Sequence, residues 1–199
     1  MATEFGSFNF IGTLAAVING LGIVRWLNNF ADYLKKKDSM SIEYSWVYSA
    51  AALFQFVLHI LLWWSLWSVR SGSLNFLSYL YMLIGPILLF IGSAFLAPEI
   101  KGDRLNLRQH YYATRPVYAS VLSLVWVWAI FASPVFRGHF AEQVPVLIMF
   151  LAVALVLKIS ATSLVHRIAV VLNWLILVVF VLAFAIELGG MGAQTPGAS

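Results

Sequence analysis

Charged residues and cysteine are what this sequence has least of. Only 10% of its 199 residues are charged and none is cysteine, whereas 62% are apolar. A soluble domain carries about 25% charged residues, so 12 basic and 8 acidic side chains are too few for a water-facing surface. Low charge with high hydrophobicity also excludes a disordered chain. The absence of cysteine excludes disulfides, thiolate chemistry and Cys-ligated metals or clusters.

Long apolar runs separated by short charged links fill the sequence. A membrane-crossing helix needs about 20 apolar residues. Runs such as 77–96 and 168–186 are apolar on every face, without the alternation of membrane β-strands. The sequence therefore predicts an all-α fold, in which residues 1–199 form one domain, a bundle of six transmembrane helices. The predicted spans are residues 8–30, 45–69, 74–97, 115–136, 144–164 and 168–188.

Basic residues concentrate in alternate links. Two of them, Arg70 and Arg137, lie in the links on the side of both termini. Those on the other side are Lys35, Lys36, Lys37, Lys101, Arg104, Arg108, Arg115, Lys158 and Arg167. Because positively charged short loops stay in the cytoplasm, the pattern predicts both termini outside, in the periplasm. This orientation signal accounts for most of the net charge of +4, and no nucleic-acid partner is needed to explain it.

The start of the chain does not resemble a secretory signal. Glu4 precedes the first apolar run, and no lysine or arginine does, whereas a signal peptide begins with a basic region. The first run is therefore predicted to be a retained helix.

Polar and aromatic side chains fall near the middle of the predicted spans. Residues 55, 59 and 63 repeat every four positions and share one helix face, and the tryptophans at 126 and 128 are too deep for an interfacial aromatic belt. Two interpretations stay open: hydrogen bonds that fasten the bundle, or an aromatic-walled pocket in which His59 anchors a small ligand. The set comprises Asn19, Gln55, His59, Trp63, Trp126 and Trp128.

The sequence predicts neither a metal nor a cofactor. A haem held between two helices needs a second mid-membrane histidine, and His110, His139 and His166 fall in links or at helix ends. A retinal-type Schiff base needs a lysine at depth, and Lys158 lies near the inner edge. The carboxylates that a proton pump needs at depth are all terminal or in links.

Two features of the predicted spans concern helix packing. Gly12, Ala16 and Gly20 are four residues apart, which favours close helix–helix contact within the chain or between chains. Gly85 and Pro86 fall at the centre of the third span, where proline removes a backbone donor and bends the helix. A bend of this kind occurs in routine membrane helices and also shapes substrate sites.

The longest predicted link reads APEIKGDRLNLRQHYYATRP and covers residues 97–116. Its cations and aromatics suit anionic lipid headgroups or a partner protein; they are Arg104, Arg108, His110, Tyr111 and Arg115. As an alternative, His110 would act as a base oriented by Glu99 or Asp103. No hydrolase, phosphate-loop or zinc-protease motif accompanies them, so no catalytic residue is assigned.

The middle of the chain resembles a family of uncharacterised bacterial integral membrane proteins of similar length. The resemblance covers about residues 45–130 and rests on Trp63-Trp64, Gly85-Pro86, Ala97-Pro98-Glu99 and the run DRLNLRQHYY over 103–112. It implies six helices and a bacterial inner membrane, and it implies no activity.

Three functions follow as hypotheses. The first is a non-catalytic membrane protein that assembles through helix contacts, as a homo-oligomer or an accessory subunit, with anionic lipid bound at its cytoplasmic side. The second is a channel or small-solute transporter built around the mid-membrane residues. The third is a lipid-modifying enzyme that uses residues 98–115.

Overall fold

Six helices and two very short strands make up the described part of the chain. The computed structural model describes residues 2–66, 75–99 and 104–186, with side chains from residue 12 onward. The helices are α1 (Ala2–Lys36), α2 (Trp46–Leu66), α3 (Phe76–Leu96), α4 (Leu107–Arg137), α5 (Val144–Ile159) and α6 (Ser163–Phe180), and the strands are β1 (Ser41–Glu43) and β2 (Arg104–Asn106). A single π-helical segment, Val181–Ala185, continues α6.

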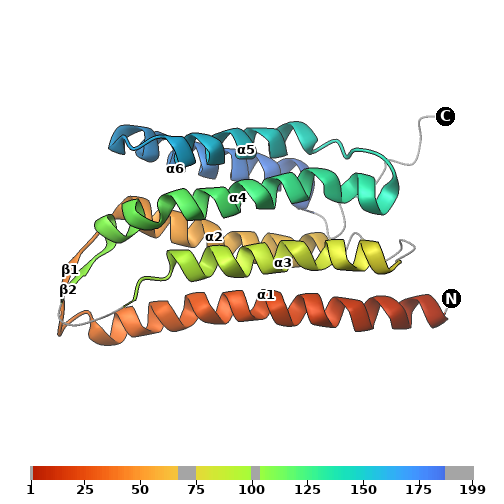
Figure 1. The fold of residues 1–199 in the computed structure, drawn as a ribbon, viewed down its shortest axis with the longest axis horizontal. Coiled ribbons are helices and arrows are strands. Elements are labelled where there is room, and N and C mark those ends of the chain that lie inside the picture. The colour runs from red at the N-terminus through yellow and green to blue at the C-terminus, as the bar shows by residue number, and fades with distance from the viewer. Residues whose placement is uncertain (1, 67–74, 100–103, 187–199) are drawn as a thin grey trace.

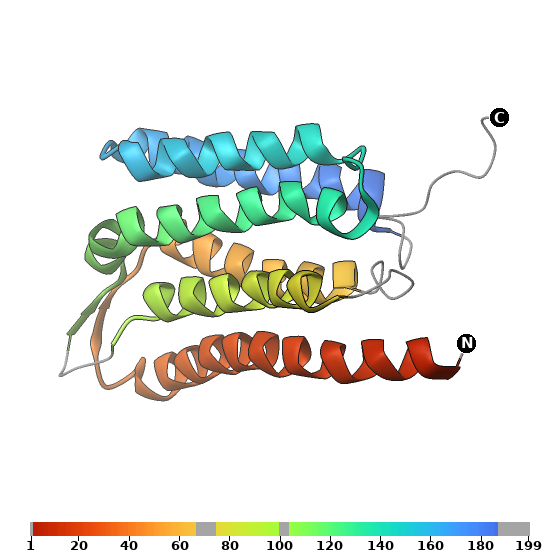
Figure 2. The ribbon, with the colours of Figure 1, turned by 45° about the vertical axis from the view of Figure 1, so that its right-hand side comes forward.

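The helices form a bundle of near-parallel rods, with α1 on the outside (Figure 1). Helix α3 packs against both α1 and α4, and α4 packs against α5. Helix α2 lies among α1, α3 and α6. The turned view in Figure 2 shows the same order, in which α1 and the α5–α6 pair lie on opposite sides of the bundle. The predicted helical bundle is therefore confirmed.

Local chemistry sets several helix ends. The side chain of Asn75 accepts from the backbone of Ser78 at 2.8 Å, and Ser78 Oγ accepts from the backbone of Asn75 at 2.9 Å, a reciprocal cap that starts α3. Asn106 caps α4 through the backbone of Gln109 at 2.7 Å. Gly138, at φ 78°, ends α4 in the left-handed region, which glycine enters without a steric penalty.

The helix bounds differ from the predicted spans at several places, beginning with α1, which runs over Ala2–Lys36 rather than 8–30. Helix α4 begins at Leu107, eight residues before the predicted 115, and continues through Pro116. Helix α5 ends at Ile159 rather than at 164, and α6 begins at Ser163 rather than at 168. Charged and polar residues lie within the first turns of α4 and α6. A prediction of helix ends from apolar runs alone therefore misplaces them.

The strands were not predicted. They pair in parallel, with Ile42 opposite Leu105, and join the α1–α2 link to the segment before α4 at one end of the bundle (Figure 1). Asn106 also donates to the carboxylate of Glu43 across this pair. Three-residue strands are too short for an alternating pattern to appear in the sequence.

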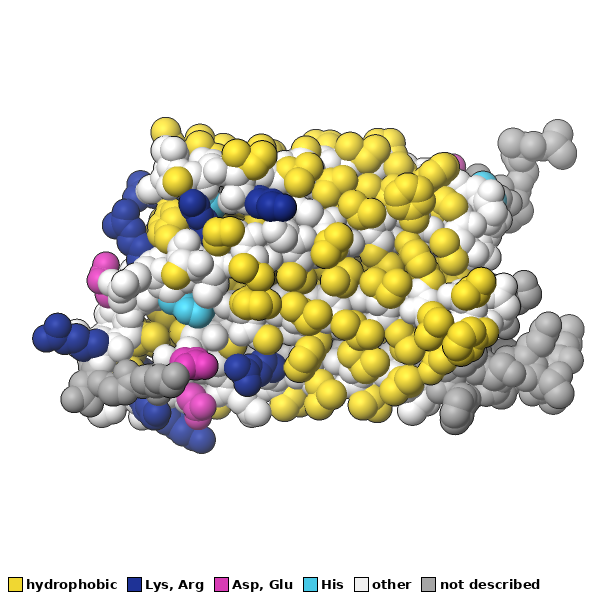
Figure 3. Space-filling view, in the orientation of Figure 1, with side chains coloured by type: hydrophobic (Ala, Val, Ile, Leu, Met, Phe, Trp, Pro, Cys, Tyr) yellow, Lys and Arg dark blue, Asp and Glu magenta, His cyan; other side chains and the backbone are white. Residues whose placement is uncertain are grey.

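Four described helical segments are long and apolar enough to cross a membrane: Trp46–Leu66, Phe76–Leu96, Leu107–Arg137 and Ser163–Ala185. Helix α5 has 16 residues, about 24 Å at a rise of 1.5 Å per residue, shorter than a hydrocarbon core of about 30 Å. Figure 3 shows apolar side chains over the length of the visible face, whereas most coloured charges gather at the end that carries the strands.

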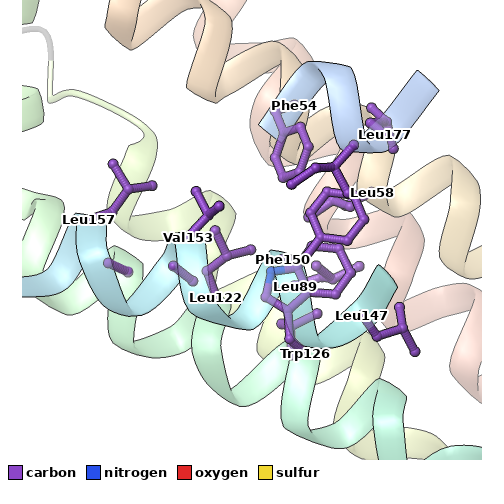
Figure 4. Packing of buried hydrophobic residues seen from close by; sticks show 14 of the residues in the cluster. Phe54, Leu58, Leu89, Leu122, Trp126, Leu147, Phe150, Val153, Leu157 and Leu177 are labelled. Atoms are coloured by element: carbon purple, nitrogen blue, oxygen red, sulfur yellow. The ribbon is translucent and has the colours of Figure 1, made fainter. Parts of the chain in front are cut away.

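The main core lies among α2, α3, α4, α5 and α6. The rings of Trp126 and Phe150 are stacked, with centroids 4.3 Å apart and planes 9° from parallel. Leu58, Leu89 and Leu147 surround them (Figure 4). This stack fixes the position of α4 relative to α5, because offset aromatic pairs gain energy beyond their buried area.

Candidate functional site

A buried polar cluster joins α1, α2 and α3 at His59. The ring of His59 is 0% exposed, and its Nδ1 lies 2.7 Å from Asn19 Oδ1 while its Nε2 lies 2.8 Å from Ser93 Oγ. Asn19 Nδ2 donates to the carbonyl of His59 at 3.0 Å. Because an amide oxygen only accepts, Nδ1–H donates to Asn19, and in a neutral imidazole of this tautomer Nε2 accepts from the hydroxyl of Ser93.

Gln55 extends this cluster to α4. Its amide nitrogen donates to the carbonyl of Leu89 at 2.8 Å and reaches Ser93 Oγ at 3.5 Å. Its oxygen accepts from the hydroxyl of Tyr118 at 3.3 Å. The described side chains satisfy one another, so the geometry favours the fastening interpretation over His59 as an anchor for a ligand. Ser93 and Tyr118 were missed by sequence reasoning, because one hydroxyl in an apolar helix carries no spacing signal.

Helix α1 approaches the cluster through Gly22. A Cβ built on Gly22 would lie 2.2 Å from Cε1 of His59, so only glycine lets the imidazole pack against the α1 backbone. Ala15 and Asn19 are buried on the same side of α1. The inward face of α1 is therefore Ala15, Asn19 and Gly22.

The predicted packing face lies elsewhere on α1. Gly12, Ala16 and Gly20 are only half-buried, and a Cβ added to Gly20 would meet nothing within 4 Å. At Gly20, the alternative of close packing within the described chain is therefore wrong. The face of α1 that carries Asn19 turns toward the other helices instead, because the buried amide of Asn19 needs its partners there. Assembly between chains through this face stays a prediction.

The structure separates the tryptophans from the polar cluster. Trp63 is 53% exposed, so its predicted place beside His59 is wrong. Trp126 stacks on Phe150 in the main core. Trp128 exchanges two hydrogen bonds with Tyr81, one at 2.8 Å from its indole nitrogen to the Tyr81 carbonyl and one at 2.6 Å from the Tyr81 hydroxyl to its own carbonyl.

Gly85 and Pro86 both lie inside α3, which runs unbroken from Phe76 to Leu96. A Cβ on Gly85 would lie 2.5 Å from Cη2 of Trp128. Gly85 therefore makes room for the indole of Trp128. This packing role is separate from the effect of Pro86 on the helix.

A cavity of about 390 Å³ lies at the strand end of the bundle, between α1, α2 and α3. Five of its fourteen lining residues are aromatic and most of the others are aliphatic, and we call this space the aromatic cavity. Ser93 lies in both this cavity and the polar cluster. The lining comprises Trp26, Asn29, Phe30, Tyr33, Tyr44, Tyr48, Ser49, Ala52, Leu53, Ser93, Leu96, Ala97, Pro98 and Leu107. Its volume is within the range of about 300–1,000 Å³ that is typical of ligand pockets.

The cavity wall is braced at Trp26. Its indole nitrogen donates to the carbonyl of Ala52 at 2.9 Å, and its ring lies 4.7 Å from Phe56 and 5.5 Å from Phe30, centroid to centroid. These contacts hold α1 against α2 at this level.

The predicted headgroup residues divide into two groups. Arg104 and Arg108 are exposed, as headgroup contact requires. His110 instead bonds the carbonyl of Leu96 at 3.1 Å, and Tyr111 is buried with its hydroxyl 3.0 Å from His166 Nδ1. Arg115 lies 3.0 Å from His166 Nε2 and donates to the carbonyl of Ser160. His110, Tyr111 and Arg115 therefore join helices, and His166, which sequence reasoning placed in a link or at a helix end, contacts both Tyr111 and Arg115.

Two predicted basic residues, Arg70 and Lys101, lie outside the described residues, as does Asp103. Within the described ranges, no group of three or more His, Cys, Asp or Glu residues is placed to hold a metal ion. Comparisons of this chain with protein-family models, curated proteins and solved structures found no match.

Proposed function

We propose that this chain is a six-span, non-catalytic membrane protein that binds an amphipathic small molecule in the aromatic cavity between α1, α2 and α3. The proposal rests on this cavity, because its volume and its aromatic side chains are typical of a ligand pocket. Two further helices, α1 and α5, complete the six spans. The expected assembly through Gly12, Ala16 and Gly20 is a separate question and stays a prediction.

The lining defines the class of ligand. Trp26, Phe30 and Tyr48 line the cavity with aromatic side chains that suit an apolar or aromatic body, and Asn29 and Ser49 line it with an amide and a hydroxyl that suit a polar group. Lys35 and Lys36, in the last turn of α1, lie at the same end of the bundle. A molecule with an apolar body and a polar or anionic head at that end matches this arrangement.

Filling the cavity should remove the ligand. We expect native mass spectrometry of the protein from mild detergent to reveal a bound small molecule, and Ala52→Phe to lose most of that added mass, because the new ring occupies the void. The matched control is Ala152→Phe on the exposed side of α5, which should keep the ligand. Wild-type protein without bound mass, in detergent and in lipid nanodiscs alike, contradicts the proposal.

The distribution of basic residues supports a particular orientation of the bundle across the membrane. The six-helix order brings Lys36, Arg104, Arg108, Lys158 and Arg167 to one end of the bundle, and Arg137 lies at the other. Under the positive-inside rule the basic end is cytoplasmic. We propose that both termini face the periplasm of a bacterial cell; the bacterial inner membrane is implied by the family resemblance alone.

Single cysteines test this orientation, because the natural chain has none. Ser41→Cys marks the basic end and Glu142→Cys the opposite end; both positions are exposed. In bacterial spheroplasts we expect a membrane-impermeant thiol reagent to label position 142 at once and position 41 only after the membrane is opened. The reverse order of labelling would invert the proposed orientation, and immediate labelling of both would overturn the six-span arrangement.

A further inference from the structure

The aromatic cavity is open on one side, between α1 and α2. Phe30 of α1 and Leu53 of α2 both line it, and their side chains are 47% and 46% exposed. In a bundle that spans a membrane, exposed apolar side chains of this kind face lipid chains, which are as apolar as they are. Tyr44, which lines the cavity at the strand end, is also exposed. The opening therefore faces the cytoplasmic leaflet of the bilayer and continues toward the membrane surface.

Two other sides of the cavity are closed. On the side of α3, Leu96 and Ala97 are buried. Toward the middle of the bundle, the ring of Trp26 lies 4.7 Å from that of Phe56, centroid to centroid, and its indole nitrogen donates to the carbonyl of Ala52. These contacts close the seam between α1 and α2 above the cavity. A long apolar group therefore has its way into the cavity from the bilayer.

The lining carries an amide whose hydrogen bonds are unused. Two of the lining hydroxyls are already engaged, since Ser93 lies 2.8 Å from Nε2 of His59 and Ser49 donates to the carbonyl of Ser45 at 3.2 Å. Asn29 is half-buried, and its amide forms no hydrogen bond within the described part of the chain. No charged side chain lines the cavity. An apolar group that ends in a neutral carbonyl therefore suits this lining, because the amide N–H groups of Asn29 donate to a carbonyl oxygen.

The depth of Asn29 matches that of the ester groups of a phospholipid. Asn29 comes seven residues before Lys36, the last residue of α1, which is about 10 Å at a rise of 1.5 Å per residue. The headgroup region of one leaflet is about 5–8 Å thick. When Lys36 lies among the headgroups, the glycerol esters of a neighbouring phospholipid lie near the level of Asn29.

We infer that the aromatic cavity binds one acyl chain of a glycerophospholipid of the cytoplasmic leaflet, through the opening between α1 and α2. An ester carbonyl of the lipid accepts from Asn29, the chain lies among the aromatic and aliphatic lining residues, and the headgroup stays at the membrane surface. The site is the cavity of the proposed function, on which the inference rests, and the lipid is the class of ligand that the cavity takes.

Native mass spectrometry of the delipidated chain in mild detergent, titrated with dioleoylphosphatidylglycerol, tests this site. We expect one lipid to bind saturably per chain. The diether analogue, which has the same chains without ester carbonyls, should bind about fivefold more weakly, since a neutral hydrogen bond contributes about 1 kcal/mol. Ala52→Phe should abolish the binding of both lipids, and Ser49→Phe takes its place if Ala52→Phe does not fold.

Asn29→Leu removes the same contact from the side of the protein. It should weaken binding of the ester lipid about fivefold and leave binding of the diether lipid unchanged, because the diether lacks that contact in either chain. The matched control is Asn28→Leu. Asn28 is the neighbouring residue of α1, is exposed and is not part of the lining, so this variant should bind both lipids as the natural chain does.

The outcomes separate the lipid from the cavity. A bound molecule that Ala52→Phe displaces but that is not a phospholipid would overturn the inference and leave the proposed function standing. Equal binding of the ester and diether lipids, an equal effect of Asn29→Leu on both, or full lipid binding by the folded cavity-filling variant would also overturn the inference. Absence of any molecule that Ala52→Phe displaces would contradict the proposed function itself.

Discussion

Replacing His59 with leucine is expected to lower the free energy of unfolding by about 2–4 kcal/mol. Leucine has a similar volume but removes both ring contacts of the imidazole. Asn19 Oδ1 then loses its 2.7 Å partner, and Ser93 Oγ keeps only the 3.5 Å contact with Gln55. A buried polar atom left unpaired costs about 1–3 kcal/mol. Unfolding by SDS in mixed micelles, followed by circular dichroism, measures the loss.

The control for His59→Leu is Trp63→Leu, one turn further along α2. Trp63 is 53% exposed and lies outside the polar cluster, so its replacement should change stability by less than about 0.5 kcal/mol. Equal losses in the two variants would mean that the polar cluster does not fasten the bundle.

Adding one methyl group to α1 should be nearly as damaging. In Gly22→Ala the new Cβ would lie 2.2 Å from His59 Cε1 and 2.8 Å from its Nε2, so either α1 moves away or the imidazole rotates out of its hydrogen bonds. Overpacking of this kind costs about 1–3 kcal/mol, to which the lost hydrogen bonds add. The same SDS titration should therefore show a loss of about 3 kcal/mol.

Gly20→Ala, two residues away on the same helix, is expected to have the opposite sign. Nothing lies within 4 Å of the added Cβ, and replacing glycine by alanine inside a helix stabilises it by about 0.5–1 kcal/mol. The comparison separates a steric effect at Gly22 from a general effect of glycine content in α1. A destabilised Gly20→Ala together with an unaffected Gly22→Ala would show that α1 is rotated from the position described.

The polar cluster and the aromatic cavity have related but separate roles in this interpretation. The cluster fixes α1 on α2 and α3 through His59, and Trp26 fixes it again one level closer to the strands. The aromatic cavity begins at the level of Trp26 and extends toward the strands, where its α1 lining runs from Trp26 to Tyr33. Weakening the cluster is therefore expected to disturb ligand binding indirectly, whereas Ala52→Phe acts on the cavity itself.

Sequence reasoning reached the class of fold because hydrophobicity is a local property. Long runs without charge, such as 77–96, can only be buried helices or membrane helices, whereas the charges between the runs do not mark the helix ends, since Arg108 and Arg115 lie inside α4. The same reasoning singled out Asn19, Gln55 and His59, since polar side chains in apolar helices are costly without partners. It did not anticipate Ser93, Tyr118 or His166, because a partner is recognised only once two helices are placed side by side.

The amino-acid sequence by itself thus determined a helical bundle, and it named three members of the polar cluster. Tertiary structure alone decided which face of α1 turns inward, that Trp63 faces outward, and that Gly22 and Gly85 make room for His59 and Trp128. The physical reason is that helix composition fixes which residues avoid water or need a partner, whereas rotation and spacing between helices depend on the fit of side chains that are distant in the sequence.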